Sequence, residues 1–148
     1  MNDTDDFTAK YRRHNEILAE CNAFNKSAVF DALADSGITT VTVNFNGEGD
    51  SGQIEDVSAL SDGVTVPVPD TQVDVRSVMW GSDAPETTRT PLYDAIEALC
   101  YDFLSETHGG WENNDGAFGD FTFGVKDRSI ALDFNARFSD TVNYSHTF

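Results

Sequence analysis

The stretch Phe121-Thr-Phe-Gly-Val-Lys-Asp-Arg-Ser-Ile-Ala-Leu-Asp-Phe134 decides the fold, because apolar and polar residues alternate along both of its halves. This alternation is typical of two strands, and a two-residue loop at Asp127-Arg128 joins them into a predicted β-hairpin. All the apolar side chains then share one face of the hairpin. The predicted pairs are Phe121 with Phe134, Phe123 with Leu132, and Val125 with Ile130.

A hairpin with one apolar face needs other elements to cover that face. We therefore expect a two-layer α+β fold, an antiparallel sheet with a C-terminal β-hairpin and with helices packed on one face. The opposite face stays open to solvent or to a partner. It carries Asp120, Thr122, Asp133, Asn135 and Arg137.

Helices are predicted on both sides of the chain's middle. Between Leu92 and Leu104 apolar residues recur every three or four positions, which is typical of an amphipathic helix. Thr90-Pro91 supplies an N-cap and a first-turn proline, His108 falls in the last turn, and Gly109-Gly110 end the helix.

The N-terminal segment is also predicted to be helical. The same periodicity runs from Phe7 to Phe24, and Asn25-Lys-Ser27 interrupts it. Ser27 is a candidate N-cap for a second short helix that Gly37 closes. The pattern predicts a helical pair or one kinked helix.

Strands fill most of the middle of the chain. Residues 38–45 alternate as a half-buried strand, and residues 53–57 are its candidate hairpin partner across a glycine-rich turn. Residues 64–68 alternate too, but Pro67 and Pro69 confine them to a sheet edge. Residues 73–80 fit a strand or a short helix, and residues 81–89 are predicted to be a polar loop.

Length and composition indicate a single domain over residues 1–148, with a helical segment at 7–36, a body at 38–138 and a tail at 139–148. Cys21 and Cys100 lie on apolar helical faces, so we expect buried thiols and no disulfide. The sequence has neither a membrane span nor a signal peptide, which predicts a cytoplasmic protein.

The sequence is strongly acidic, with 26 acidic and 9 basic residues and a formal net charge of −17. No Lys or Arg occurs in residues 27–75 or 90–125. Such a charge repels nucleic acid and attracts basic protein surfaces. It also serves solubility alone in many proteins, and that alternative stays open.

The richest loop of the chain is His108-Gly-Gly-Trp-Glu-Asn-Asn-Asp-Gly-Ala-Phe-Gly-Asp120. If the protein is an enzyme, His108, Glu112, Asp115 and Asp120 are the candidate acid, base or metal-binding groups. Glycine and Asn/Asp turn chemistry also explains much of this loop. The candidate binding residues are Glu48, Asp50, Glu55, Trp111, Glu112, Asn113, Asn114 and Asp115.

The turn after the first predicted strand partly resembles an EF-hand calcium loop, with oxygen side chains at Asn44, Asn46, Glu48 and Glu55. Its flanks are predicted strands, whereas that motif needs helices. A plain hairpin turn is therefore the preferred interpretation, and no metal or other cofactor is predicted.

Two stretches carry a wider resemblance. Gly49-Asp-Ser-Gly-Gln-Ile-Glu55 and Tyr101-Asp-Phe-Leu-Ser-Glu-Thr-His-Gly-Gly-Trp-Glu-Asn-Asn-Asp-Gly-Ala117 are similar to a family of small acidic bacterial proteins of unknown function. Such families are often carried on mobile elements, which implies an interaction or counter-defence role. The resemblance implies no catalytic residues.

The leading hypothesis is a non-enzymatic acidic module that binds a basic protein surface, as a nucleic-acid mimic or counter-defence inhibitor. It implies neither direct nucleic-acid binding nor membrane binding, and leaves the oligomeric state open. The alternatives are a small metal-dependent enzyme centred on the loop from His108 to Asp120, and a structural protein whose acidity serves solubility.

Overall fold

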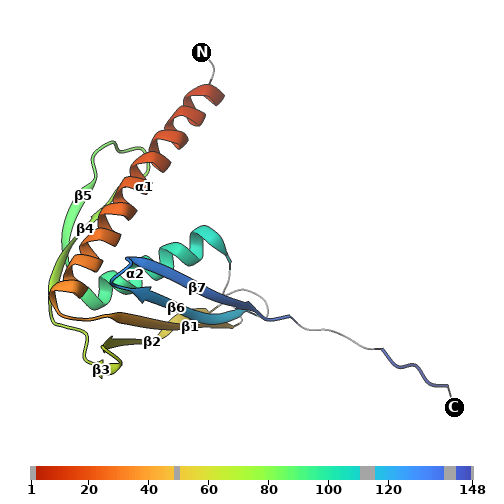
Figure 1. Ribbon diagram of the computed structural model, residues 1–148. Coiled ribbons are helices and arrows are strands. Elements are labelled where there is room, and N and C mark those ends of the chain that lie inside the picture. The colour runs from red at the N-terminus through yellow and green to blue at the C-terminus, as the bar shows by residue number, and fades with distance from the viewer. Residues whose placement is uncertain (1–2, 49–50, 111–115, 139–142, 148) are drawn as a thin grey trace.

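The computed structural model describes residues 3–48, 51–110, 116–138 and 143–147, without the side chains of residues 3–5, 48 and 51. Within these residues it has two helices and seven antiparallel strands (Figure 1), which confirms the predicted α+β class. In chain order the elements are α1 (Asp3–Asp35), β1 (Thr40–Glu48), β2 (Ser51–Ser61), β3 (Val64–Val66), β4 (Gln72–Ser77), β5 (Glu86–Pro91), α2 (Leu92–Thr107), β6 (Ala117–Gly124) and β7 (Ser129–Ala136).

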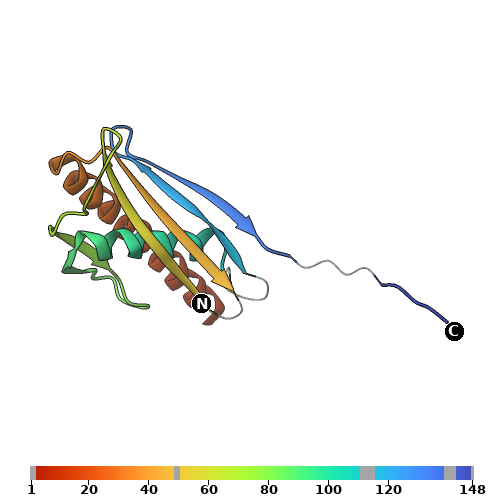
Figure 2. The same ribbon diagram turned by 90° about the horizontal axis from the view of Figure 1, so that it is seen from below.

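Five strands form one sheet in the order β3-β2-β1-β6-β7, and β4 and β5 form a separate two-stranded ribbon. Figure 2 views the sheet from below, with α1 and α2 together on its far side. The two helices therefore cover one face of the sheet. β6 and β7 form the predicted C-terminal hairpin.

The central strands β1 and β6 bury every second side chain. Val41, Val43 and Phe45 on β1, and Phe121 and Phe123 on β6, are at most 2% exposed. This alternation places all five side chains against the helices. The helices complete the core with Leu92, Ile96, Leu99, Cys100 and Leu104 from α2, and with Val29, Phe30 and Leu33 from α1.

The register of the β6–β7 hairpin differs by two residues from the predicted one. The observed pairs include Phe121 with Leu132, Phe123 with Ile130, and Gly119 with Phe134. The connection is longer than predicted, because the Arg128 N–H donates to the Val125 carbonyl at 3.3 Å and Arg128 adopts a φ of 52°. A shift of two residues leaves every side chain on its predicted face.

Gly119 explains why this register is favoured. A Cβ at this position would lie 1.9 Å from the carbonyl oxygen of Asp133 and 3.0 Å from Cζ of Phe45. Because no side chain stands between them, the rings of Phe45 and Phe134 stack across Gly119 with centroids 6.1 Å apart. The glycine thus ties three strands together.

The N-terminal segment is one continuous helix, so the predicted interruption at Asn25-Lys-Ser27 is wrong. Asn25 has a tertiary role: its amide donates to the Arg76 carbonyl at 2.9 Å and accepts from the Arg76 N–H at 2.6 Å. These two bonds attach α1 to β4. The helix ends at Asp35, and Gly37, with a φ of 75°, follows as the predicted left-handed closing residue.

Residues 73–80 contain most of strand β4, and the predicted polar loop at 81–89 contains the first residues of β5. Thr90 and Pro91 also belong to β5, so Thr90 is not the N-cap of α2, which begins at Leu92. Residues 86–91 form a strand because they pair with β4: Arg89 lies opposite Asp74 and contacts its carboxylate at 3.2 Å.

The β1–β2 hairpin is present as predicted, and β3 lies at the sheet edge, as expected from the prolines Pro67 and Pro69 that follow it. The pairing of β1 with β2 contains a bulge, because Asn44 lies opposite Asp56 while Phe45 lies opposite Ile54. Glu55 is therefore the extra residue on β2.

Cys21 and Cys100 are buried and unpaired, as predicted. Burial raises the pKa of the Cys100 thiol far above its usual range, and Glu97 raises it further. Neither described helix is long and apolar enough to cross a membrane. The division into segments and a tail stays a prediction.

Replacing Gly119 with alanine tests the close approach of the three strands. We expect Gly119→Ala to lower the free energy of unfolding by about 3 kcal/mol, since the new methyl group would displace β7 or the Phe45 ring. Urea denaturation measures this loss. The control is Gly109→Ala, whose Cβ meets nothing closer than the Ser105 carbonyl at 3.4 Å. Equal stability of both variants would contradict the assignment.

Candidate functional site

The sheet face that the helices leave uncovered carries mostly polar side chains. We call it the open face (Figure 2). Its side chains are exposed or half-buried because they alternate with the buried ones on each strand. They are Thr42, Asn44 and Asn46 on β1, Gln53, Asp56 and Ser58 on β2, Phe118, Asp120 and Thr122 on β6, and Ala131, Asp133 and Asn135 on β7. Sequence alternation had predicted Asp120, Thr122, Asp133 and Asn135 on this face, but neither Phe118 nor Ala131.

One row across the open face holds three carboxylates. Asp56 lies opposite Asn44, Asn44 lies opposite Asp120, and Asp120 lies opposite Asp133. We call these four residues the acidic row. Asn44 donates its side-chain amide to the Asp120 carboxylate, which fixes the orientation of both groups. Asp120 and Asp133 are like charges on directly paired positions, an arrangement that destabilises the sheet.

No cation neutralises the acidic row within the described part of the chain. Arg137 follows the last residue of β7, and its guanidinium donates to the carbonyls of Gly47 at 2.9 Å and Ala117 at 3.2 Å. It also lies 4.7 Å over the Phe118 ring. Arg137 thus closes one end of the sheet and leaves the row negative.

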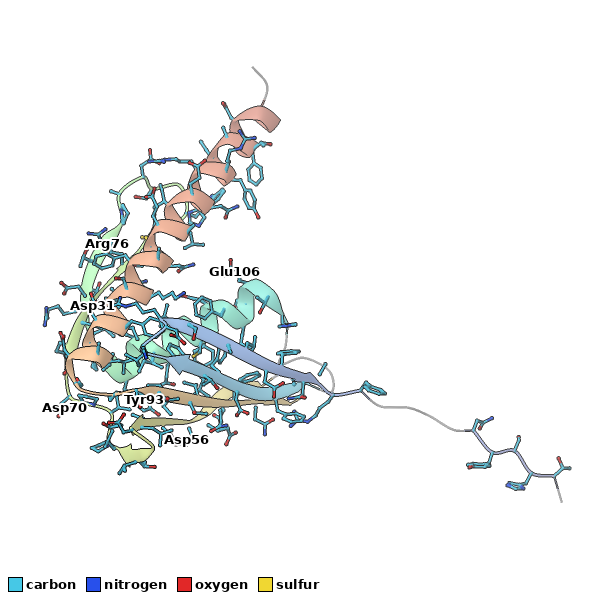
Figure 3. The ribbon with its side chains drawn as sticks, viewed as in Figure 1. Asp31, Asp56, Asp70, Arg76, Tyr93 and Glu106 are labelled. Carbon is cyan, nitrogen blue, oxygen red and sulfur yellow. The ribbon has the colours of Figure 1, made fainter. Side chains whose placement is uncertain are left out.

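The negative potential extends around the β2 edge to α2. Desolvation raises the pKa of the Tyr93 hydroxyl, and the carboxylates of Glu97 and Asp56 raise it further. Tyr93 and Asp56 are labelled in Figure 3. Burial, with a contribution from Asp94, also raises the pKa of Glu97. Asp56, a residue of the open face, therefore also acts electrostatically on Tyr93 of α2.

Tyr101 protects the same edge from strand pairing. Its hydroxyl accepts the Ile54 N–H at 2.9 Å, so one backbone donor of β2 is satisfied by a side chain of α2. Glu55 is exposed at the bulge beside Ile54, and the Gln53 amide lies 3.5 Å from its carboxylate. The predicted binding residue Glu55 therefore stands at the margin of the open face.

The structure does not bring His108 and Asp120 together. The His108 ring stacks on Phe134, with centroids 3.7 Å apart and an interplanar angle of 5°. Phe134 lies on the helix-covered face beside Phe45, whereas Asp120 lies on the open face. The sheet thus separates the two groups. The remaining predicted loop residues, Trp111, Glu112, Asn113, Asn114 and Asp115, lie outside the described residues.

The candidate calcium loop lies between strands β1 and β2, as the sequence predicted. An EF-hand loop, in contrast, lies between two helices. Asn44 and Asn46 are on β1, where the Asn46 side-chain oxygen is buried without a partner in the described structure. The side chain of Glu48 and all of Asp50 lie outside the description. Among the described residues no three His, Cys, Asp or Glu side chains gather to hold a metal ion.

Sequence reasoning missed Asp56 as a partner of Asn44. The sequence shows two neighbouring acids, Glu55 and Asp56, on the second predicted strand. The bulge shifts the pairing of Asp56 by one residue relative to a regular ladder, so that it lies opposite Asn44. Without the bulge, strict alternation would place Asp56 on the covered face. Only the observed register brings it into the acidic row.

The fold and the open face define a small α+β protein with one helix-covered and one acidic sheet face. A protein-family model described as a family of unknown function, DUF6878, matches residues 21–148, and the chain belongs to this family. No curated protein and no solved structure matches the chain significantly.

The like charges of the paired residues Asp120 and Asp133 lead to a testable prediction. Asp133→Asn removes the like-charge pair, so we expect the free energy of unfolding at neutral pH to rise by about 0.5 kcal/mol. The gain should shrink at high salt, because salt screens exposed charges. Urea denaturation at two salt concentrations measures it. The control of equal net charge is Asp70→Asn, which removes an exposed loop carboxylate. An equal rise in the free energy of unfolding for this control would refute the repulsion between Asp120 and Asp133.

Proposed function

We propose that this chain is a non-enzymatic binding protein that presents the open face to a basic surface of another protein. The observation that carries the proposal is the acidic row, in which three carboxylates stand on neighbouring strands and no cation among the described residues pairs with them. A net charge of −17 supports the same class of partner.

The row is suited to bind Arg and Lys side chains. Neighbouring strands lie about 4.8 Å apart, so the row spans roughly 14 Å from β2 to β7. Carboxylates held at fixed spacing accept charge-assisted hydrogen bonds without ordering flexible side chains first. The flanking side chains of Gln53, Thr122 and Asn135 add uncharged donors and acceptors around it.

The preferred partner class is a DNA- or RNA-binding protein, whose basic surface normally contacts phosphates. Regular negative charges on a rigid support compete for such a surface, since phosphate contacts are largely electrostatic. Small families of unknown function are often carried on mobile elements, which is consistent with an inhibitor of this kind. Binding of this type loses affinity steeply with salt.

Two triple variants of equal net charge test the proposal. Asp56→Asn, Asp120→Asn and Asp133→Asn together remove the row, while Asp35→Asn, Asp70→Asn and Asp127→Asn remove exposed carboxylates elsewhere. Pull-downs from host lysate at low salt identify the partner, and titration calorimetry then measures affinity. We expect the row variant to bind at least about tenfold more weakly, which is about 1.4 kcal/mol.

The control triple variant should keep most of the wild-type affinity. If it loses as much affinity as the row variant, bulk charge and not the open face is responsible. If low-salt pull-downs recover no basic protein at all, the proposed function is wrong.

A further inference from the structure

Strand β7 forms an edge of the five-stranded sheet. It pairs with β6 along all eight of its residues without a bulge, and no strand among the described residues pairs with its other side (Figure 2). The strand contains no Pro, Lys or Arg, the residues that often prevent pairing at sheet edges. Its outward backbone N–H and C=O groups can therefore bind a further strand.

The opposite edge of the sheet is protected from strand addition. Strand β3 has only three residues and is followed by Pro67. Where β3 does not cover β2, the Tyr101 hydroxyl accepts the Ile54 N–H, and Glu55 forms a bulge. Such features keep other chains from pairing with a sheet. Because β7 has none of them, it is the edge suited to accept a strand.

The apolar side of β7 is incompletely buried. Ile130 and Leu132 are half-buried, whereas their partners on β6, Phe123 and Phe121, are at most 1% exposed. A groove of about 280 Å³ lies beside them, lined by Lys26, Phe103, Thr107, Phe121, Ile130 and Leu132. Apolar side chains of an added strand would enter this groove and bury the exposed parts of the β7 side chains.

The polar side of β7 carries the end of the acidic row. Asp133 is exposed, and its neighbour on β6 is the carboxylate residue Asp120. A residue on an added strand opposite Asp133 would lie about 5 Å from it, on the side away from Asp120. A Lys or Arg at this place would compensate the two like charges. Charge complementarity therefore favours a basic strand.

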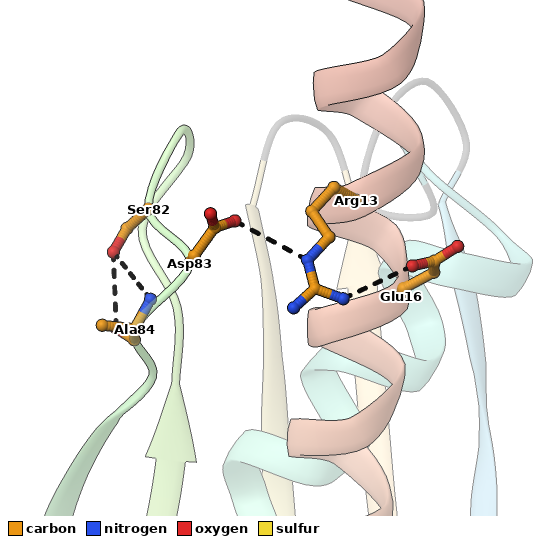
Figure 4. Close-up of polar contacts among 5 residues, drawn as sticks. All are labelled: Arg13, Glu16, Ser82, Asp83 and Ala84. Carbon is orange, nitrogen blue, oxygen red and sulfur yellow. Dashed lines mark hydrogen bonds and ion pairs between the residues drawn. The ribbon is translucent and has the colours of Figure 1, made fainter.

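The cations of the chain itself are engaged elsewhere. Arg128, immediately before β7, pairs with a carboxylate of α1, and Arg137, immediately after it, donates to backbone carbonyls. Arg13 on α1 lies between the carboxylates of Asp83, at 3.7 Å, and Glu16, at 3.6 Å (Figure 4). No described cation forms an ion pair with Asp133. A cation at this edge has to come from a partner.

A second copy of the chain does not suit this edge. Antiparallel pairing of two β7 strands would place their open faces side by side and join two acidic rows, each on a chain of net charge −17. The groove adds a further condition, since Lys26 on its wall disfavours a basic side chain there. The best partner strand therefore alternates, with basic residues toward the open face and apolar residues toward the groove.

We propose that β7 binds an extended segment of the partner protein as an additional antiparallel strand. Basic residues of the segment lie beside Asp133 on the open face, and its apolar residues enter the groove beside Ile130 and Leu132. Main-chain hydrogen bonds hold the segment, and the alternating side chains select it. This inference rests on the proposed function, because it specifies how a basic partner meets the acidic row.

An acetylated and amidated peptide of alternating Lys and Val, with the eight residues of β7, tests the strand addition. Fluorescence anisotropy at physiological ionic strength measures its affinity. The control peptide has the same composition, with all Lys before all Val. We expect this control to bind at least about tenfold more weakly, because it cannot place charges on one face and apolar groups on the other.

Backbone methylation tests the main-chain hydrogen bonds. Two alternating peptides carry N-methyl groups, one on every Lys and the other on every Val. Since only alternate N–H groups of an antiparallel strand point to its neighbour, one of these peptides should lose at least about tenfold in affinity. The other should bind nearly as the unmethylated peptide does. Equal affinities of the two would overturn the strand addition.

Two variants of the acidic row locate the added strand. Asp133→Asn should weaken binding of the alternating peptide about threefold, because this carboxylate lies opposite the peptide. Asp56→Asn removes an equal charge from the same row, but roughly 19 Å from the added strand, beyond the Debye length of about 8 Å. It should change the affinity much less, and equal losses in both variants would contradict binding at β7.

The remaining outcomes are also decisive. No binding of the alternating peptide up to about 1 mM, or equal binding of the control peptide, overturns the strand addition. A dimer of the chain alone, with the β7 amides protected from hydrogen exchange, would assign this edge to a second copy and overturn it too. The proposed function survives these results, because the triple variant of the row and the natural partner test it separately.

Discussion

The alternation of side chains on the two central strands constrains the rest of this structure. β1 and β6 each place large apolar residues at every second position, so only one sheet face can form a core. Val43 and Phe121 lie opposite each other on that face, and both helices must pack there. The positions between them, such as Asn44 and Asp120, are therefore also paired, but on the side that no helix covers. The places of Asn44, Asp120 and Asp133 in the acidic row follow directly from the pattern that builds the core, and the bulge at Glu55 adds Asp56.

A second constraint fixes how the C-terminal hairpin joins this sheet. Gly119 lies between Phe45 and Phe134, and its missing side chain lets the two rings stack across β6. His108, at the end of α2, stacks on Phe134. This sequence of contacts connects the helix end to three strands. It also explains why His108 belongs to the covered face, away from the carboxylate of Asp120, and why the two do not form one site.

Local sequence patterns could predict the fold class, the C-terminal hairpin and the face on which Asp120 and Asp133 lie, because period-two alternation is a property of each strand alone. They could not predict features that depend on distant residues. Asn25 resembles a helix break until its bonds to Arg76 are seen, and the bulge at Glu55 brings Asp56 beside Asn44 only in the paired sheet. The sequence around Trp80 does not indicate that this residue lies beside α1, since a long loop brings it there.

The central claim is that the open face is the working surface of the protein. The most direct measurement is an NMR titration of the isotope-labelled chain with a short Arg- and Lys-rich peptide at physiological ionic strength, following every backbone amide. We predict that the perturbed amides cluster on β1, β2, β6 and β7 around Asn44, Asp120 and Asp133. Perturbations that cluster on the helices, or that spread evenly over all acidic residues, would contradict it.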